Sequence, residues 1–238
     1  GVKIMTSTEV TAVDTKGKGC KVTVKDKKGA ESTIECDVVL SAVGVVSNVE
    51  NIGLEDVGIL VEKGKIKTDE FYKTNMPGYY AIGDVVAGPA LAHVASAEGI
   101  ICVEAICGHH PAPLNYGNIP GCTYTHPEVA SVGYTEAQAK EKGYDIMVGK
   151  FPFSASGKAA AGGHKDGFVK VIFDKKYGEW LGCHMVGEGV TDIIIEAVVA
   201  RNLETTGLEI LKSIHPHPTM SEAVMEAVAL AYGECIHL

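Results

Sequence analysis

The residues best suited to chemistry lie near the C-terminus, where two histidines alternate with two prolines. His215 and His217 each precede a proline, and Glu222 follows His217 by five positions. Because proline fixes its own φ and restricts the residue before it, the backbone is stiff on both sides of His217. A carboxylate close to an imidazole can hold the ring in one tautomer and stabilise its charged form. The segment is therefore equipped for general acid–base catalysis.

Glu222 can also be interpreted as part of a helix cap. Residues 219–232 carry apolar side chains at helical spacing, and Thr219 with Glu222 matches a capping box, in which the glutamate serves only the end of the helix. Spacing alone does not separate a catalytic pair from a cap, so both interpretations stay open.

A second candidate site lies where a short apolar strand, predicted over residues 79–82, ends in Gly83 and Asp84. Glycine lets a ligand approach the backbone, and the carboxylate can accept hydrogen bonds from the hydroxyls of a sugar or sugar alcohol. A long helix is predicted from about Leu91 to Cys107. Its N-terminus, over residues 90–93, would offer free N–H groups and a positive dipole end to electron-rich ligand atoms. We favour this binding function over a plain strand–turn–helix with an exposed aspartate.

Residues 2–40 are predicted to be mostly strands. These are expected over Lys3–Val13, Cys20–Lys25 and Ser32–Cys36, the last leading into an apolar strand over Asp37–Gly44. A hairpin followed by an apolar strand suits the edge of an α/β nucleotide-binding domain, where ligands lie at strand C-termini. The chain contains no G-x-G-x-x-G loop. Gly44 is explained equally well as a turn glycine or as a ligand contact.

The seven cysteines are scattered without the spacing of a disulfide framework, which favours reduced thiols in a cytosol-like compartment. Cys102 and Cys107 have the C-x4-C spacing of a redox disulfide. They lie, however, inside the predicted long helix, where positions five apart do not face each other. Two buried helix cysteines are the favoured interpretation.

No metal site is expected. His109 and His110 are adjacent in a proline-rich break that has no cysteine or carboxylate at ligand spacing. His126 and His164 are predicted to lie in loops, and His184 is predicted to be a structural residue of a strand.

The bulk composition argues against several partners. A formal net charge of −9 is unsuited to a nucleic-acid backbone, and no apolar run is long enough to span a bilayer. The first residues carry neither a signal peptide nor a transit-like segment. They resemble a strand cut out of a larger protein.

From residue 119 onwards, strands and helices form an α+β pattern. Strands are expected over 121–134, 147–151, 167–173 and 179–186, and helices over 135–143, 190–202 and 206–212. The helix over 191–201 is apolar on most faces, so we expect it to be covered by its own sheet or by a partner chain.

Five motifs that occur in order along the chain resemble a known family. They are Tyr79–Val85, Ala90–Val94 with Glu98-Gly99, Tyr124–Ala130, Gly149–Phe153 and His215–Glu222. Together they resemble the C-terminal half of the pyridine nucleotide-disulfide oxidoreductases, and most of all the members that oxidise dihydrolipoamide. The resemblance implies an FAD-dependent enzyme that converts dihydrolipoamide to lipoamide and passes electrons through FAD to NAD+.

The resemblance also implies which residues would bind the two cofactors. Asp84, with Gly83 before it, would bind the ribitol of FAD, and Gly44 and Val10 would lie beside NAD. The edge of the flavin would be met by backbone groups of Ala90, Leu91, Ala92 and His93.

By the same resemblance, His217 would be the catalytic base. It would take the proton from a dihydrolipoamide thiol, and Glu222 would orient its ring. The proton transfer matters because a thiolate is the attacking species in disulfide exchange.

The resemblance divides the chain into three pieces. Residues 1–46 and 47–115 would be the C-terminal parts of an NAD-binding and an FAD-binding domain, both Rossmann-like, and residues 116–238 would be an α+β interface domain. A homodimer through the interface domain is implied, in which His217 and Glu222 complete the active site of the other subunit. The expected partner is the lipoyl domain of a 2-oxo acid dehydrogenase or glycine cleavage complex, in the cytoplasm or, in a eukaryote, the mitochondrial matrix.

The chain departs from the family pattern in what it lacks. The FAD and NAD fingerprints and the redox-active cysteine pair are missing, and residues 154–163 are rich in alanine and glycine where relatives carry an arginine. We therefore expect a C-terminal fragment that is inactive alone and holds neither cofactor well. A non-catalytic dimerisation module, or a related reductase resembling glutathione or mercuric reductase, stays open as an alternative.

Overall fold

Three short strands form the sheet of the first of two units, Gly1–Asn48 and Val49–Leu238, into which the chain divides. The computed structural model describes every residue from Gly1 to Leu238. β1 (Glu9–Asp14), β2 (Cys20–Lys25) and β3 (Glu31–Cys36) are antiparallel and lie in the order β1-β2-β3. The alternation of polarity along β2 buries Val22 and Val24.

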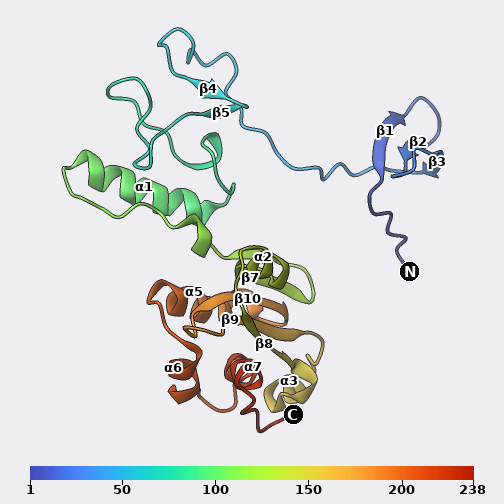
Figure 1. Ribbon diagram of the computed structural model, residues 1–238. Helices are drawn as coiled ribbons and strands as arrows, with labels where there is room; N and C mark the ends of the chain where they lie inside the picture. Colours follow the sequence, from blue (N-terminus) through green and yellow to red (C-terminus); the bar gives the residue numbers. More distant parts are fainter. The chain divides into compact units, whose positions relative to one another are not determined.

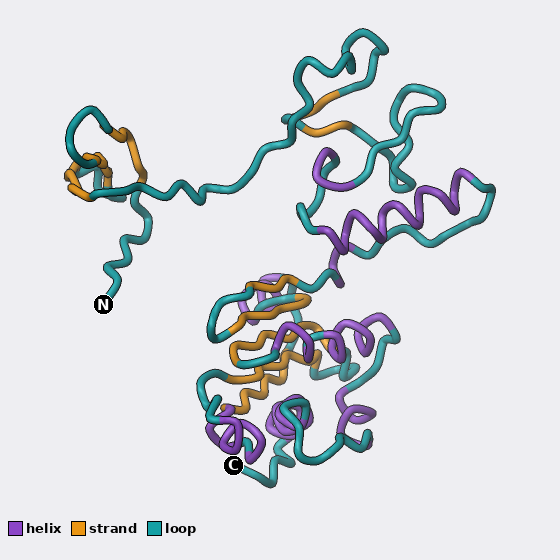
Figure 2. Tube along the Cα trace, turned by 180° about the vertical axis from the view of Figure 1, so that it is seen from behind, coloured by secondary structure: helices purple, strands orange, loops and turns teal.

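Two expectations for this unit are wrong. The first strand begins at Glu9 rather than at Lys3, and residues 37–48, which include the apolar segment ending at Gly44, form no strand. Figure 2 draws this segment as loop between β3 and the β4–β5 ribbon. Val38 and Val43 are 80% and 93% exposed. An apolar strand of an α/β sheet needs neighbouring strands for its backbone groups, and no strand in this chain pairs with it.

Residues 49–118 contain one long helix and little other regular structure. α1 spans Ala92–Ile106, which confirms the prediction to within a residue at each end. The other elements are short: β4 (Val61–Glu62), β5 (Lys65–Ile66) and the 3-10 turns η1 (Gly83–Val85) and η2 (Tyr116–Asn118). Apolar side chains from the loops form a small core of Val49, Leu54, Ile59, Ile66, Ala81 and Val86.

The strand predicted over residues 79–82 is wrong. The segment makes a single isolated bridge, between Lys73 and Tyr80, and continues into η1 without a ladder. Ile82 is 39% exposed. As with residues 37–44, an apolar run becomes a strand only where a neighbouring strand pairs with it.

The remaining residues form the predicted α+β module around a five-stranded antiparallel sheet (Figure 1). Its strands are β6 (Gly121–Thr123), β7 (Glu128–Gly133), β8 (Ile146–Pro152), β9 (Phe168–Asp174) and β10 (Trp180–Gly187), in the order β6-β7-β10-β9-β8. The helical elements are α2 (Glu136–Glu141), η3 (Phe153–Ala155), α3 (Gly157–Gly162), α4 (Val190–Ile193), α5 (Ile195–Asn202), α6 (Gly207–Lys212) and α7 (Glu222–Tyr232).

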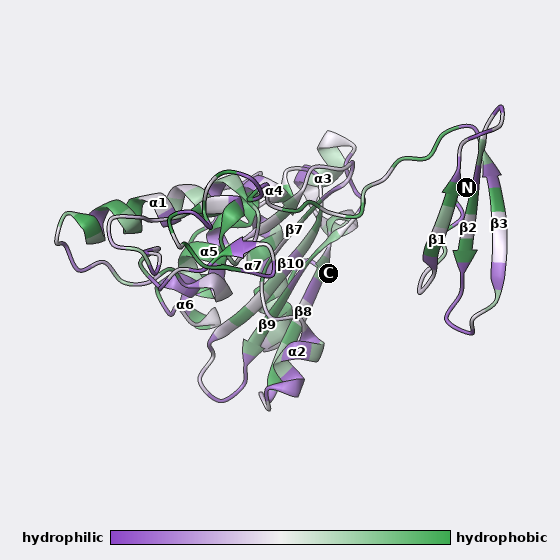
Figure 3. Cartoon of the chain, turned by 90° about the horizontal axis from the view of Figure 1, so that it is seen from above, coloured by the Kyte–Doolittle hydropathy of each residue, from purple (hydrophilic) through white to green (hydrophobic).

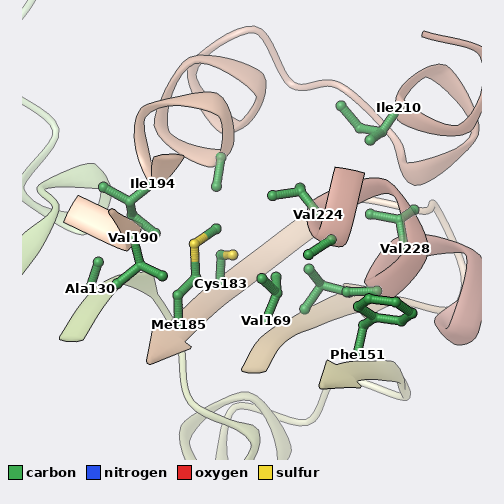
Figure 4. Packing of buried hydrophobic residues seen from close by; sticks show 14 of the residues in the cluster. Ala130, Phe151, Val169, Cys183, Met185, Val190, Ile194, Ile210, Val224 and Val228 are labelled. Atoms are coloured by element: carbon green, nitrogen blue, oxygen red, sulfur yellow. The ribbon is translucent and has the colours of Figure 1, made fainter. Parts of the chain in front are cut away.

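Helices cover both faces of this sheet, whose strands are largely apolar (Figure 3). On one face Ala139 of α2 packs with Ile172 and Leu181. On the other face α4 to α7 pack over β7 to β10, and Figure 4 shows Ile194 and Val224 among the side chains that fill this core. None of the helices combines the length and the apolar composition that crossing a bilayer requires.

α7 approaches β8 closely because Gly149 has no side chain. A Cβ at Gly149 would overlap the carbonyl oxygen of Ala227 in α7. The helix turns Val224 and Val228, four residues apart, into the core, as a helix with one apolar face does. Because α7 rests on the sheet in this way, the sheet positions its first turn, which carries Glu222.

Candidate functional site

Glu222 holds His217 and the start of α7 at the same time. One carboxylate oxygen, Oε1, lies 2.9 Å from His217 Nδ1, and the other, Oε2, accepts the backbone N–H of Thr219 at 2.8 Å. The Thr219 hydroxyl donates to the carbonyl of Pro216, so only the glutamate half of a capping box is formed. The two interpretations of the sequence are therefore compatible, because each uses a different oxygen.

The charge of Glu222 determines the tautomer of His217. Partial burial raises the pKa of the Glu222 carboxyl, but the hydrogen bonds from the Thr219 N–H and from His217 outweigh it and leave the pKa below its ordinary value. An ionised carboxylate only accepts hydrogen bonds, so Nδ1 of His217 must carry the proton. Nε2 of the neutral ring then keeps its lone pair, on a side chain that is 78% exposed. His217 is thus arranged to accept a proton from a molecule that reaches it.

His215 cannot act in the same way, because both of its nitrogens face acceptors. Nε2 lies 2.8 Å from Glu196 Oε1, and Nδ1 lies 3.3 Å from the carbonyl of Ser213. The hydrogen bond with Glu196 raises the pKa of His215 against the opposing effect of burial. With its side chain only 7% exposed, His215 ties the loop before α7 to α5. The peptide bond between His217 and Pro218 is cis.

A pocket of about 470 Å³ lies beside the His217–Glu222 pair. It is also lined by Glu226, one turn further along α7, and by His237, whose Nδ1 lies 2.5 Å from Glu226 Oε1. The Cys235 thiol donates to the other oxygen of Glu226 at 3.1 Å. The sequence did not identify this second glutamate–histidine pair, whose members are eleven positions apart and meet only because the C-terminal residues fold back along α7.

Gly83 and Asp84 are positioned by a buried glutamate, Glu98, which stands out in the sequence only as part of a motif. Glu98 of α1 is 1% exposed; its Oε2 accepts the Gly83 N–H and its Oε1 accepts the Tyr116 hydroxyl, both at 2.6 Å. Gly83 has a φ of +74°, which glycine adopts readily. The hydrogen bonds compensate the carboxylate for its loss of water, and they fix η1 against α1 with Asp84 exposed.

The N-terminus of α1 is arranged as the sequence predicted. Its N-cap is Leu91, no side chain caps it, and its first turn contains no acidic residue. Ala90, Ala92 and His93 are exposed and Leu91 is half-buried. The His93 ring is engaged elsewhere, with Nε2 at 3.1 Å from the Pro120 carbonyl. Backbone N–H groups at a helix start, next to an exposed Asp84, fit an electron-rich ring that carries a polyhydroxylated chain, as FAD does.

The other residues singled out from the sequence are not brought to these sites. Val10 lies in β1, paired with Val24, and Gly44 lies in the segment after β3 with a φ of +102°. Their proximity to NAD stays a prediction. Cys102 and Cys107 form no disulfide; Cys102 is buried, which raises the pKa of its thiol, whereas Cys107 is exposed, so the prediction of two buried cysteines was half correct.

Two family models match the chain and leave few residues uncovered. Residues 1–99 match the model described as pyridine nucleotide-disulphide oxidoreductase. Residues 119–228 match the model described as the dimerisation domain of the same family. The second match falls on the five-stranded sheet with its helices, and the first ends in α1, beyond Glu98.

Known proteins with similar sequences or structures point to the same family. A dihydrolipoyl dehydrogenase of Rhizobium etli is 51% identical over 238 residues, all of this chain and 50% of the relative. One of Zymomonas mobilis is 48% identical over the same length, 51% of that relative. The crystal structure of LpdA from Mycobacterium tuberculosis superposes with a TM-score of 0.86 at 26% identity, over 96% of this chain and 49% of the other. The chain spans about half the length of the curated relatives it matches.

Proposed function

The chain belongs to the pyridine nucleotide-disulphide oxidoreductase family, and on that premise we propose that it is part of an FAD-dependent enzyme that oxidises dihydrolipoamide to lipoamide with NAD+. The observation that carries the proposal is the His217–Glu222 pair, in which Nδ1 is bound to a carboxylate and Nε2 is left as a base. The relatives from Rhizobium etli and Zymomonas mobilis bear the name of this activity.

The proposed catalytic step is a proton transfer to His217. A thiol of dihydrolipoamide gives its proton to Nε2, and Glu222 Oε1 stabilises the imidazolium that forms. The thiolate attacks a disulfide of the enzyme and forms a mixed disulfide, and the second thiol of the substrate then displaces the enzyme sulfur. Lipoamide leaves with its S–S bond closed, and the enzyme disulfide is reduced to two thiols.

Two groups in this chain would hold FAD, and a third would position them. The Asp84 carboxylate would accept hydrogen bonds from the ribitol, and the N–H groups at the start of α1 would meet the electron-rich edge of the ring. Glu98 would keep Gly83 and α1 in place for both contacts. When bound, FAD would supply the two-electron chemistry that links the reduced thiols to NAD+.

We assign the chain to three domain pieces: residues 1–46 to an NAD-binding domain, 47–115 to an FAD-binding domain and 116–238 to the interface domain. The match to a dimerisation domain supports a homodimer through the last piece, with His217 and Glu222 serving the partner's active site. The apolar residues Ile195, Val199 and Leu203 recur every fourth position along α5 and its C-cap and are 50–69% exposed, which supports a subunit interface at this helix. A lipoyl domain is the proposed macromolecular substrate, in the cytoplasm or the mitochondrial matrix.

Replacing His217 by glutamine in the full-length enzyme tests the proposal. Loss of a general base costs about 10²- to 10⁴-fold in turnover of dihydrolipoamide. Reduction of an artificial acceptor by NADH does not need the thiol base and should continue at the normal rate. His109→Gln, which changes an exposed histidine outside the site, is the matched control. Near-normal dihydrolipoamide turnover by His217→Gln would refute the assignment.

The chain by itself is the second test. Because the Gly-rich phosphate loops that hold FAD and NAD are not among its residues, the purified 238-residue chain should stay colourless with excess FAD and should not reduce NAD+. A chain that retains flavin absorbance through gel filtration would contradict this expectation.

A further inference from the structure

Two histidines and a glutamate from three separate loops meet at one end of the five-stranded sheet. His126 lies between β6 and β7, His164 between α3 and β9, and Glu188 between β10 and α4. The strand pairing explains the convergence. Gly187 lies opposite Glu128 and Val186 lies opposite Phe168, so β7 and β9 begin at the end of the sheet where β10 stops. One ligand atom from each of the three residues lies within 4.8 Å of the other two.

The spacing inside this cluster is not that of hydrogen bonds. Glu188 Oε2 lies 3.5 Å from His126 Nδ1 and 3.9 Å from His164 Nδ1. The other three histidine–glutamate pairs of the chain are 2.5, 2.8 and 2.9 Å apart, as hydrogen bonds require. One carboxylate oxygen therefore stands between two imidazole rings without being bonded to either. The rings themselves are almost perpendicular, at 88°, with centroids 6.2 Å apart.

The spacing is close to that of ligands around a tetrahedral ion. Zinc binds imidazole nitrogen and carboxylate oxygen at about 2.0–2.2 Å, which places two ligand atoms of a tetrahedral site roughly 3.4 Å apart. The shorter separation matches this value, and the longer one needs only a small rotation of exposed side chains. The exposures are 79% for His126, 46% for His164 and 44% for Glu188, so water can fill a fourth position.

We propose that His126, His164 and Glu188 bind one divalent transition-metal ion of the zinc class, with water as the fourth ligand. Two imidazoles and one carboxylate suit Zn²⁺, Cu²⁺ or Ni²⁺, whereas Ca²⁺ and Mg²⁺ prefer sites built from oxygen. Without the ion, the three side chains meet only at 3.5 and 3.9 Å and in one ring contact, so the ion connects the loops more firmly and stabilises this end of the sheet. The site does not depend on the proposed activity. It also departs from the expectation of no metal, because its ligands are 38 and 24 positions apart and share no motif.

Calorimetric titration of the 238-residue chain with ZnCl₂ tests the proposal, together with the thermal unfolding midpoint. We expect one site that is weakened at least tenfold by His126→Gln, by His164→Gln and by Glu188→Gln, and a rise of the midpoint with Zn²⁺ that each variant loses. His109→Gln, in the exposed pair of histidines after α1, is the control and should bind as the unchanged chain does.

The design separates this site from the other zinc ligands of the chain. The three side chains are 44–79% exposed and contact one another, so the variants should fold. Circular dichroism checks this expectation. Co²⁺ is the second probe: a tetrahedral site gives strong visible absorption that the double variant His126→Gln/His164→Gln should lack. Equal Zn²⁺ affinity and equal Co²⁺ spectra for the unchanged chain and the double variant would overturn the proposal.

Discussion

Replacing Glu222 by glutamine separates its electrostatic role from its structural one. The glutamine amide keeps an oxygen that can accept the Thr219 N–H, so the start of α7 retains its hydrogen bond. What is lost is the negative charge 2.9 Å from His217 Nδ1. The amide NH2 then faces Nδ1 and donates to it, which favours the tautomer with the proton on Nε2. The variant therefore impairs both the tautomer and the charge stabilisation of the base, while it preserves the helix end.

The size of the effect follows from the kind of hydrogen bond that is replaced. A hydrogen bond to a charged partner contributes about 1.5–3 kcal/mol, against about 0.5–1.5 kcal/mol between neutral partners. The Glu222 side chain is 28% exposed, so solvent screens part of this difference. We expect a loss of about 1.4 kcal/mol in stabilisation of the imidazolium, which is roughly a tenfold decrease in turnover. The reversed tautomer lowers the turnover further.

Two measurements on the full-length enzyme check this prediction. Turnover of dihydrolipoamide should fall by about tenfold or more in Glu222→Gln, while the midpoint of urea unfolding should stay close to normal. Glu222→Ala should lose the turnover and, in addition, about 1 kcal/mol of stability, because the Thr219 N–H is left without its acceptor. Normal turnover in Glu222→Gln would show that Glu222 serves only the helix, and equal stability of the two variants would show that it is no cap.

Three further predictions concern the folded chain. Gly149→Ala should destabilise it by about 1–3 kcal/mol or more, because the new Cβ meets the Ala227 carbonyl, whereas Gly157→Ala, with open space around it, should be near neutral in the same urea titration. Tyr116→Phe should cost about 1–3 kcal/mol by leaving one oxygen of the buried Glu98 without its donor; Tyr124→Phe, at an 81% exposed position, should cost almost nothing. The pKa of His215 is raised in the folded chain because of its hydrogen bond with Glu196. Protonated His215 therefore contributes fully to the unfolding free energy below about pH 6.5, and this contribution is lost as the pH rises through the raised pKa. The unfolding free energy should therefore decline as the pH rises above about 6.5, and a His215→Gln variant that declines equally would contradict this.

Local patterns in the sequence were sufficient for most helices of the second unit. The capping box of Thr135 with Gln138 starts α2, and a second one, of Thr206 with Glu209, starts α6. Each box lies within four residues, so these helix starts depend on local sequence alone. The strands β8 to β10 were also predicted closely, since each is a largely apolar segment that pairs with another strand of the chain.

Apolar runs without a partner strand misled the prediction. Residues 37–44 and 79–82 have the composition of buried strands, yet neither joins a ladder. Propensity for extended backbone depends on cross-strand neighbours and burial. It therefore says what a segment can become beside a suitable partner, and not whether this chain provides that partner.

By itself, the sequence determined which side chains could do chemistry and which of them lie within one turn or loop. His217 and Glu222 are five positions apart, and the N-terminus of α1 follows Gly83 and Asp84 within a few residues. Only the tertiary structure decided that Glu98 reaches back to Gly83 and that Glu196 forms a hydrogen bond with His215. It also decided that His126, His164 and Glu188 meet. These contacts join residues 15 to 62 positions apart. They form because the sheet and the helices packed on it bring distant segments together, and no spacing along the chain encodes that arrangement.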